Sequence, residues 1–114
     1  FSREGFTLAF QNVEKDKEFY KKACKMEGQN SFRDISEQCI KELLCQFIKE
    51  QVGENAKLHN WMPSEYLAEY YAQSMSYVLQ RWLESDLVLP ASEVAKLYYY
   101  ILNNSMEEIL AKMR

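Results

Sequence analysis

The chain has 114 residues, the size of one domain, with only 3 glycines and 2 prolines, a composition that favours long helices. Its formal net charge is −3, and residues 58–114 carry four basic against seven acidic side chains, so the basic surface that duplex DNA requires is missing. No run of about 18 uncharged apolar residues occurs, which excludes a transmembrane helix. We expect one all-α domain over residues 1–114 that binds neither duplex DNA nor a membrane by itself.

Apolar side chains recur at three- and four-residue spacing, which predicts helices with a buried face. The first two helices are expected near residues 2–11 and 13–26. Phe6 and Phe10 lie on the apolar side of the first. Asn12 suits the N-cap of the second, because its side chain can accept a free backbone N–H. Gly28 suits the left-handed residue that ends that helix.

The third helix is expected near residues 31–52. Ser31 can cap it, with Asp34 three residues later in the capping-box position. Gly53 is expected to end it. The connection that follows is polar and shows no strand pattern.

Prolines mark the last two helices, which are expected near residues 63–84 and 92–112. Pro63 fits a first helical turn, where a missing N–H is harmless. Pro90 marks the restart after a break, and Ser92 is the expected N-cap of the last helix. The polar run Asn103-Asn104-Ser105 is expected to lie inside that helix. Together the five segments predict a five-helix bundle.

The last two helices carry more apolar surface than one buried face needs. We therefore expect them to pair with the same two helices of a second chain, as a four-helix bundle. The alternative is that the excess surface covers other helices of the same chain. The residues expected in the dimer interface are Ala68, Ala72, Ser76, Leu79, Leu83, Leu97, Ile101, Leu102, Ile109 and Met113.

Catalytic and metal-binding patterns are missing from the sequence. His59 is the single histidine and stands in a polar loop without a nearby nucleophile. Two carboxylate pairs, Glu50 with Glu54 and Glu65 with Glu69, have no His or Cys beside them, and we interpret them as solvated. The line of lysines in the second helix is interpreted in the same way. The three cysteines have no metal-ligand spacing, which favours reduced thiols in a cytoplasmic protein. We expect no catalytic residue, no metal and no cofactor. The residues concerned are Glu50, Glu54, Glu65, Glu69, Lys17, Lys21, Lys25, Cys24, Cys39 and Cys45.

Aromatic and sulfur-containing side chains gather on the second, third and fourth predicted helices. Pockets between helices are usually apolar with a few polar groups, which tyrosine and serine hydroxyls could supply. These side chains either line such a pocket or simply fill the core. The candidates are Phe19, Tyr20, Phe32, Cys39, Tyr71, Ser74 and Met75.

Three patches together resemble the C-terminal domain of TetR-family transcriptional regulators, most of all the subgroup that includes the activator of a dihydroxyacetone kinase operon. The first patch runs from Asn12 through Phe19-Tyr20 to Phe32. The second runs from Tyr70-Tyr71 to Trp82-Leu83, and the third is Leu89-Pro90-Ala91-Ser92-Glu93-Val94-Ala95. Two positions depart from the family pattern. The family helix that corresponds to the second patch usually has glycine where Ser74 stands, and often a small residue where Tyr77 stands.

The resemblance implies a homodimeric sensor domain without enzymatic activity. A small apolar effector, or a protein co-activator, would favour one arrangement of its helices. DNA would be read by an N-terminal helix-turn-helix that this sequence does not contain. The seven aromatic, sulfur and serine residues named above would then line the effector pocket. The alternative is a helical protein–protein interaction module without a small-molecule ligand.

Overall fold

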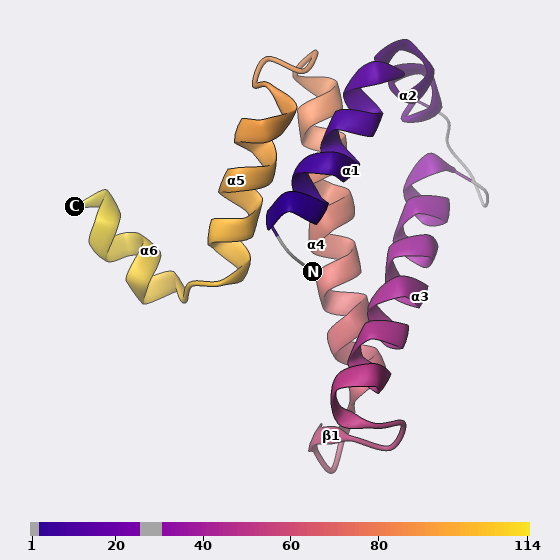
Figure 1. Ribbon diagram of the computed structural model, residues 1–114, viewed down its shortest axis with the longest axis vertical. Coiled ribbons are helices and arrows are strands. Elements are labelled where there is room, and N and C mark those ends of the chain that lie inside the picture. Colours follow the sequence, from indigo (N-terminus) through magenta and orange to yellow (C-terminus); the bar gives the residue numbers. More distant parts are fainter. Residues whose placement is uncertain (1–2, 26–30) are drawn as a thin grey trace. The chain divides into compact units, whose positions relative to one another are not determined.

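The computed structural model describes residues 3–25 and 31–114. Over these residues the chain forms six helices and one short hairpin (Figure 1): α1 (Arg3–Lys15), α2 (Lys17–Ala23), α3 (Phe32–Val52), β1 (Lys57–His59), β2 (Met62–Pro63), α4 (Ser64–Glu84), α5 (Ala91–Leu102) and α6 (Met106–Met113). The all-α prediction is confirmed, although the described helices number six instead of five.

The chain divides into two compact units. The first unit combines residues 1–21 with 82–114, and the second unit spans residues 22–81. Helix α4 belongs to both, since the division falls between Arg81 and Trp82.

The prediction that a helix begins at residue 13 is wrong. Helix α1 continues through Asn12 to Lys15, and the break comes at Asp16. Asparagine costs only a fraction of a kcal/mol inside a helix relative to better helix formers, so it does not by itself stop one. At the break the Asp16 N–H donates to the carbonyl oxygen of Val13 at 3.1 Å. The expected cap at Gly28 lies outside the described residues.

The prediction of one helix over 92–112 is also wrong, because the polar run at 103–105 divides it. The side-chain amides of Asn103 and Asn104 donate to the carbonyl oxygens of Tyr99 and Tyr100, each at 2.8 Å, at the end of α5. Ser105 then starts α6. Short polar side chains of this kind compete with helical hydrogen bonds, which explains why α5 ends here.

Helix α6 begins with a complete capping box. The Glu108 N–H donates to Ser105 Oγ at 3.1 Å, and the Ser105 N–H donates to Glu108 Oε1 at 3.0 Å. The backbone hydrogen bond from Ser105, followed by the hydroxyl contact, lowers the pKa of Glu108. Two free N–H groups of the helix end are satisfied in this way.

The N-terminus of α5 is capped from a distant helix. Pro90 occupies the N-cap position instead of Ser92 and makes no side-chain cap. The Ala91 N–H donates to Glu14 Oε2 of α1 at 3.1 Å. A carboxylate is stabilising at this end of a helix, because the free N–H groups carry partial positive charge. The prediction that Ser92 is the N-cap of this helix is wrong, because the helix begins one residue earlier and Glu14 of α1 accepts its first N–H.

The predicted ends of α3 are confirmed. Ser31 Oγ accepts the Asp34 N–H at 3.2 Å, and Gly53 closes the helix with φ 92° and ψ 165°. That backbone region is essentially restricted to glycine. The expectation of a strandless connection is wrong, since β1 and β2 pair antiparallel with Lys57 opposite Pro63. Pro63 therefore lies in a strand directly before α4 and not in its first turn.

The core of the first unit forms where α1 lies beside α5 (Figure 1). Phe6 meets Tyr98 edge-on with ring centres 5.7 Å apart, and Phe10 meets Trp82 in the same way at 5.5 Å. Such pairs add to the stabilisation from buried area. The indole N–H of Trp82 donates to the carbonyl oxygen of Leu89 at 2.8 Å. The buried apolar residues of this unit are Phe6, Phe10, Trp82, Leu83, Ala91, Val94, Ala95 and Tyr98.

The second unit places α3 beside α4 through small side chains. Ala68, Ala72 and Ser76 of α4 are fully buried. The Ser76 hydroxyl lies 3.2 Å from that of Ser36 on α3, as a hydrogen bond. Small residues let two helices approach closely. On the α3 side of this contact, by contrast, no residue is fully buried.

Candidate functional site

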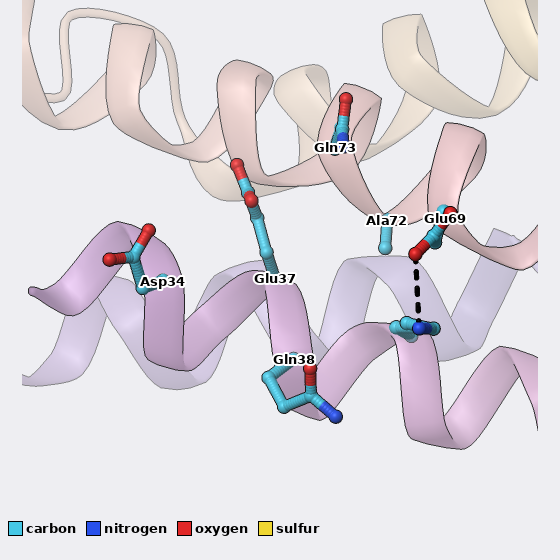
Figure 2. Close-up of a pocket in the computed structure, with 7 residues that line it drawn as sticks. Asp34, Glu37, Gln38, Glu69, Ala72 and Gln73 are labelled. Atoms are coloured by element: carbon cyan, nitrogen blue, oxygen red, sulfur yellow. Dashed lines mark hydrogen bonds and ion pairs between the residues drawn. The ribbon is translucent and has the colours of Figure 1, made fainter. Parts of the chain in front are cut away.

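A polar groove of about 250 Å³ lies between α3 and α4 in the second unit. Figure 2 shows Glu37 and Ala72 pointing into the space between the two helices. Carboxylates and amides make up most of the lining, in contrast to the apolar walls of most small-molecule sites. The lining residues are Asp34, Glu37, Gln38, Lys41, Glu69, Ala72 and Gln73.

Lys41 fixes one end of this groove. Its Nζ donates to Glu65 Oε1 at 3.0 Å and to Glu69 Oε1 at 3.1 Å, and the second contact is the dashed line in Figure 2. The hydrogen bond to Glu65, followed by that to Glu69, raises the pKa of Lys41 to about 12. The interpretation of Glu65 and Glu69 as merely solvated is wrong. Lys41 precedes both glutamates by more than twenty residues in the sequence, so no local spacing could predict this contact.

The remaining carboxylates give the polar groove an acidic character. Arg33 Nε donates to Glu37 Oε1 at 3.2 Å across one turn of α3. Asp34 lines the same groove near the start of that helix. Over the described part of the chain, no three His, Cys, Asp or Glu side chains are grouped so that they could hold a metal ion.

A second groove, of about 340 Å³, lies at the hairpin end of the second unit. It is lined by the end of α3, the connection to β1 and the start of α4. Its residues are Cys45, Lys49, Glu54, Asn55, Ala56, Lys57, Pro63, Ser64 and Glu65.

The predicted effector residues lie on three helices and line neither groove. On α3 and α4, Phe32, Tyr71, Ser74 and Met75 are half-buried, whereas Cys39 is exposed. The rings of Tyr70 and Tyr71 meet edge-on at 5.5 Å. On α2, Tyr20 is half-buried and Phe19 is 67% exposed, with their rings 5.3 Å apart.

The predicted dimer residues fall into three groups. Ala68, Ala72, Ser76 and Leu83 are buried within the single chain and have no surface left for a second one. Leu79, Leu102 and Ile109 are half-buried. Leu97 and Ile101 on α5 are each 52% exposed, and Met113 on α6 is 75% exposed. Among the predicted dimer residues, those with surface free for a partner therefore lie mainly on α5 and α6.

The turn between α4 and α5 is held by an ion pair to α2. Lys21 binds the carboxylate of Asp86, so this member of the predicted lysine line is not merely solvated. The hydrogen bond between them lowers the pKa of Asp86 and raises that of Lys21. Asp86 and the next residue, Leu87, have positive φ angles of 64° and 55°.

Comparison with known families identifies the chain. A TetR-type family model described as "Transcriptional regulator C-terminal region" matches residues 2–104. The chain belongs to this family. It is thus a regulatory domain and not an enzyme, and TetR-family regulators are homodimers.

The family match ends at Asn104 and therefore does not include α6. Neither the curated proteins nor the solved structures gave a match. In the described part of this TetR-type domain, none of the helices has an apolar stretch long enough to cross a bilayer.

Proposed function

We propose that this chain is the effector-sensing and dimerisation domain of a homodimeric transcriptional regulator. The family match over residues 2–104 carries the proposal. The matched family is described as a C-terminal region, so DNA reading is assigned to a helix-turn-helix encoded ahead of Phe1. We place the protein in the cytoplasm, where such a regulator meets DNA.

Dimerisation is assigned to α4 and α5, extended by α6. The exposed side chains of Leu97 and Ile101 support this assignment, together with the half-buried Leu79, Leu102 and Ile109. The four residues that the single chain already buries are left out of the interface. A two-fold contact uses one patch twice, so this patch must complement itself.

Light scattering on the unmodified chain tests this proposal. We expect twice the mass of the single chain at micromolar concentration, because an obligate interface of this kind buries about 2,000 Å² or more. A clean monomer would contradict it. Reading the codons ahead of Phe1 gives an independent test, and the absence of a helix-turn-helix there would contradict the regulator assignment.

Effector binding is assigned to the α3 and α4 residues of the predicted pocket: Phe32, Cys39, Tyr71, Ser74 and Met75. Four of these are half-buried, as expected of side chains that face a space between helices. The ligand class is a small, mostly apolar molecule. If the chain instead belongs to the dihydroxyacetone kinase activator subgroup, a protein co-activator takes the place of this small effector.

Replacing Met75 by tryptophan tests the effector pocket. If Met75 lines a ligand space, the larger ring is tolerated, and we expect the free energy of unfolding to change by less than about 0.5 kcal/mol. The ring should also displace the apolar probe 1-anilinonaphthalene-8-sulfonate, measured as lost fluorescence enhancement. The matched control is Leu83→Trp on the same helix, which overpacks a buried site and should cost about 1–3 kcal/mol. Equal losses in both variants, or unchanged probe fluorescence, would refute the pocket.

The exposed face of α3 favours one alternative, a protein-interaction module without a small ligand. Ile35 and Leu43 are more than half exposed at eight-residue spacing, and the exposed Cys39 lies between them. The Met75→Trp experiment distinguishes the effector pocket from the protein-interaction module, because a module without a pocket gives no displacement of the probe.

A further inference from the structure

Helix α3 contains one short motif twice, eight residues apart. The sequence Gln-x-Ile-Lys-Glu begins at Gln38 and again at Gln46. The structure repeats the contact as well, since Gln38 Nε2 donates to Glu42 Oε1 at 3.0 Å and Gln46 Nε2 donates to Glu50 Oε1 at 3.1 Å. Each glutamine therefore orients a carboxylate one helical turn further along the helix.

The two signs of charge in this motif lie on different sides of α3. Lys41 is bound to the carboxylates of α4, and Lys49 lines the groove at the hairpin end. Gln38, by contrast, points away from α4 in Figure 2, and its amide is bound to Glu42. Glu42 and Glu50 are both exposed, and among the described residues no ion pair includes either of them. Helix α3 thus presents two oriented carboxylates that lack a cation.

An exposed apolar row runs beside these carboxylates. Ile35 is 52% exposed and Leu43 is 64% exposed, with the small side chain of the exposed Cys39 between them. Residues at four-residue spacing form a ridge, and packing such a ridge into the groove of a second helix is the commonest helix–helix arrangement in globular proteins. Glu42 and Glu50 follow Ile35 and Leu43 by seven residues, close to two turns, so each carboxylate shares the side of one apolar residue.

We propose that this acidic α3 face (Ile35, Cys39, Glu42, Leu43 and Glu50) docks a helix of another protein whose own apolar row is bordered by lysine or arginine. The ridge selects a helix, and the two carboxylates without a cation select basic residues beside its apolar row. A second copy of this chain is a poorer occupant, because a two-fold contact centred on Cys39 would bring two like-charged Glu42 side chains into one contact. The proposal rests on the protein-interaction role proposed for α3 and specifies the chemistry of its partner.

Cys39 changes its assignment under this proposal. It is the one exposed member of the effector residues on α3 and α4, whereas the other four are half-buried. A docked helix would cover Cys39 at the centre of the apolar row, so it would not line the effector pocket. The remaining four residues keep that assignment.

Two designed helical peptides test the acidic α3 face. Both are about 18 residues long and carry leucine at three- and four-residue spacing, which gives one apolar side. The other positions are lysine in the first peptide and glutamate in the second. Fluorescence anisotropy measures the dissociation constant of each labelled peptide for the unmodified chain at about 0.15 M salt, where distant charges are screened. The lysine peptide should bind at least about 10-fold more tightly than the glutamate peptide.

Charge reversal at both carboxylates locates this binding on α3. Glu42→Lys combined with Glu50→Lys should raise the dissociation constant of the lysine peptide roughly 3- to 30-fold, because two attractive contacts become repulsive. The matched control combines Glu4→Lys on α1 with Glu93→Lys on α5, two exposed positions that give the same change in net charge. The control should stay within about two-fold of the unmodified chain.

Leu43→Asp tests the apolar row in the same assay. It should raise the dissociation constant of the lysine peptide roughly 10-fold or more, because one apolar contact is lost. Its control is Leu8→Asp on α1, where a leucine that is 59% exposed receives the same charge. That variant should stay within about two-fold. Circular dichroism checks that every variant is folded.

Three results would overturn the docking proposal. They are that neither peptide binds, that both peptides bind equally, or that either α3 variant weakens binding no more than its control. Light scattering on the same variants separates this question from the dimer, since all of them should keep the mass of the unmodified chain. A monomeric chain that binds the lysine peptide on α3 contradicts the dimer and supports the docking face.

Discussion

Replacing Phe10 by alanine is expected to lower the free energy of unfolding by about 3–5 kcal/mol. Phe10 is only 2% exposed, and its ring meets Trp82 edge-on at an interplanar angle of 80°. Trp82 cannot move easily to fill the space, because its indole N–H is bound to Leu89. The loss therefore combines lost burial, a lost aromatic pair and an unfilled cavity.

Urea unfolding followed by circular dichroism measures this loss. All variants should be compared at one protein concentration, since the apparent stability of a dimer depends on it. The matched control is Phe19→Ala, where the same ring is removed from a side chain that is 67% exposed. That change should stay within about 0.5 kcal/mol. If Phe10→Ala lowers the free energy of unfolding by less than about 1 kcal/mol, the core between α1 and α5 is not formed as described.

Replacing Ile101 by aspartate is expected to convert the dimer into a folded monomer. Ile101 is half exposed in the single chain, so the charge stays solvated there and folding is unaffected. In the proposed dimer the same carboxylate is buried without a partner, twice over because of the two-fold axis. An uncompensated buried charge costs about 3–5 kcal/mol, which corresponds to a 100-fold or greater loss of affinity for each copy.

Light scattering and circular dichroism together decide this prediction. Leu43→Asp on α3 is the matched control, because it places the same charge on a similarly exposed leucine outside the proposed interface. It should remain dimeric. If Ile101→Asp keeps the full dimer mass, the interface does not include this face of α5. If both variants dissociate, the interface extends over α3 and the assignment to α4 and α5 needs revision.

Several boundaries could be predicted from the sequence because they depend on local chemistry. Ser31 and Gly53 act through their own side chain or backbone freedom, so neighbouring residues suffice to place the ends of α3. The long apolar repeats gave α3 and α4 nearly to the residue. The break at Asp16 was expected at Asn12 instead, and the break at residues 103–105 was not expected, since asparagine is compatible with both a helix interior and a helix end.

The features that define the surfaces of this regulator domain required the tertiary structure. Lys41 meets Glu65 and Glu69, and Glu14 caps α5, only because the fold brings distant segments together. The sequence by itself determined that the last two predicted helices carry excess apolar surface. It could not determine which side chains the single chain buries, because burial of Ala68, Ala72, Ser76 and Leu83 depends on packing against segments far away in sequence. Exposure at Leu97, Ile101 and Met113 is what remains after that packing, so the predicted dimer residues that keep free apolar surface lie mainly on α5 and α6.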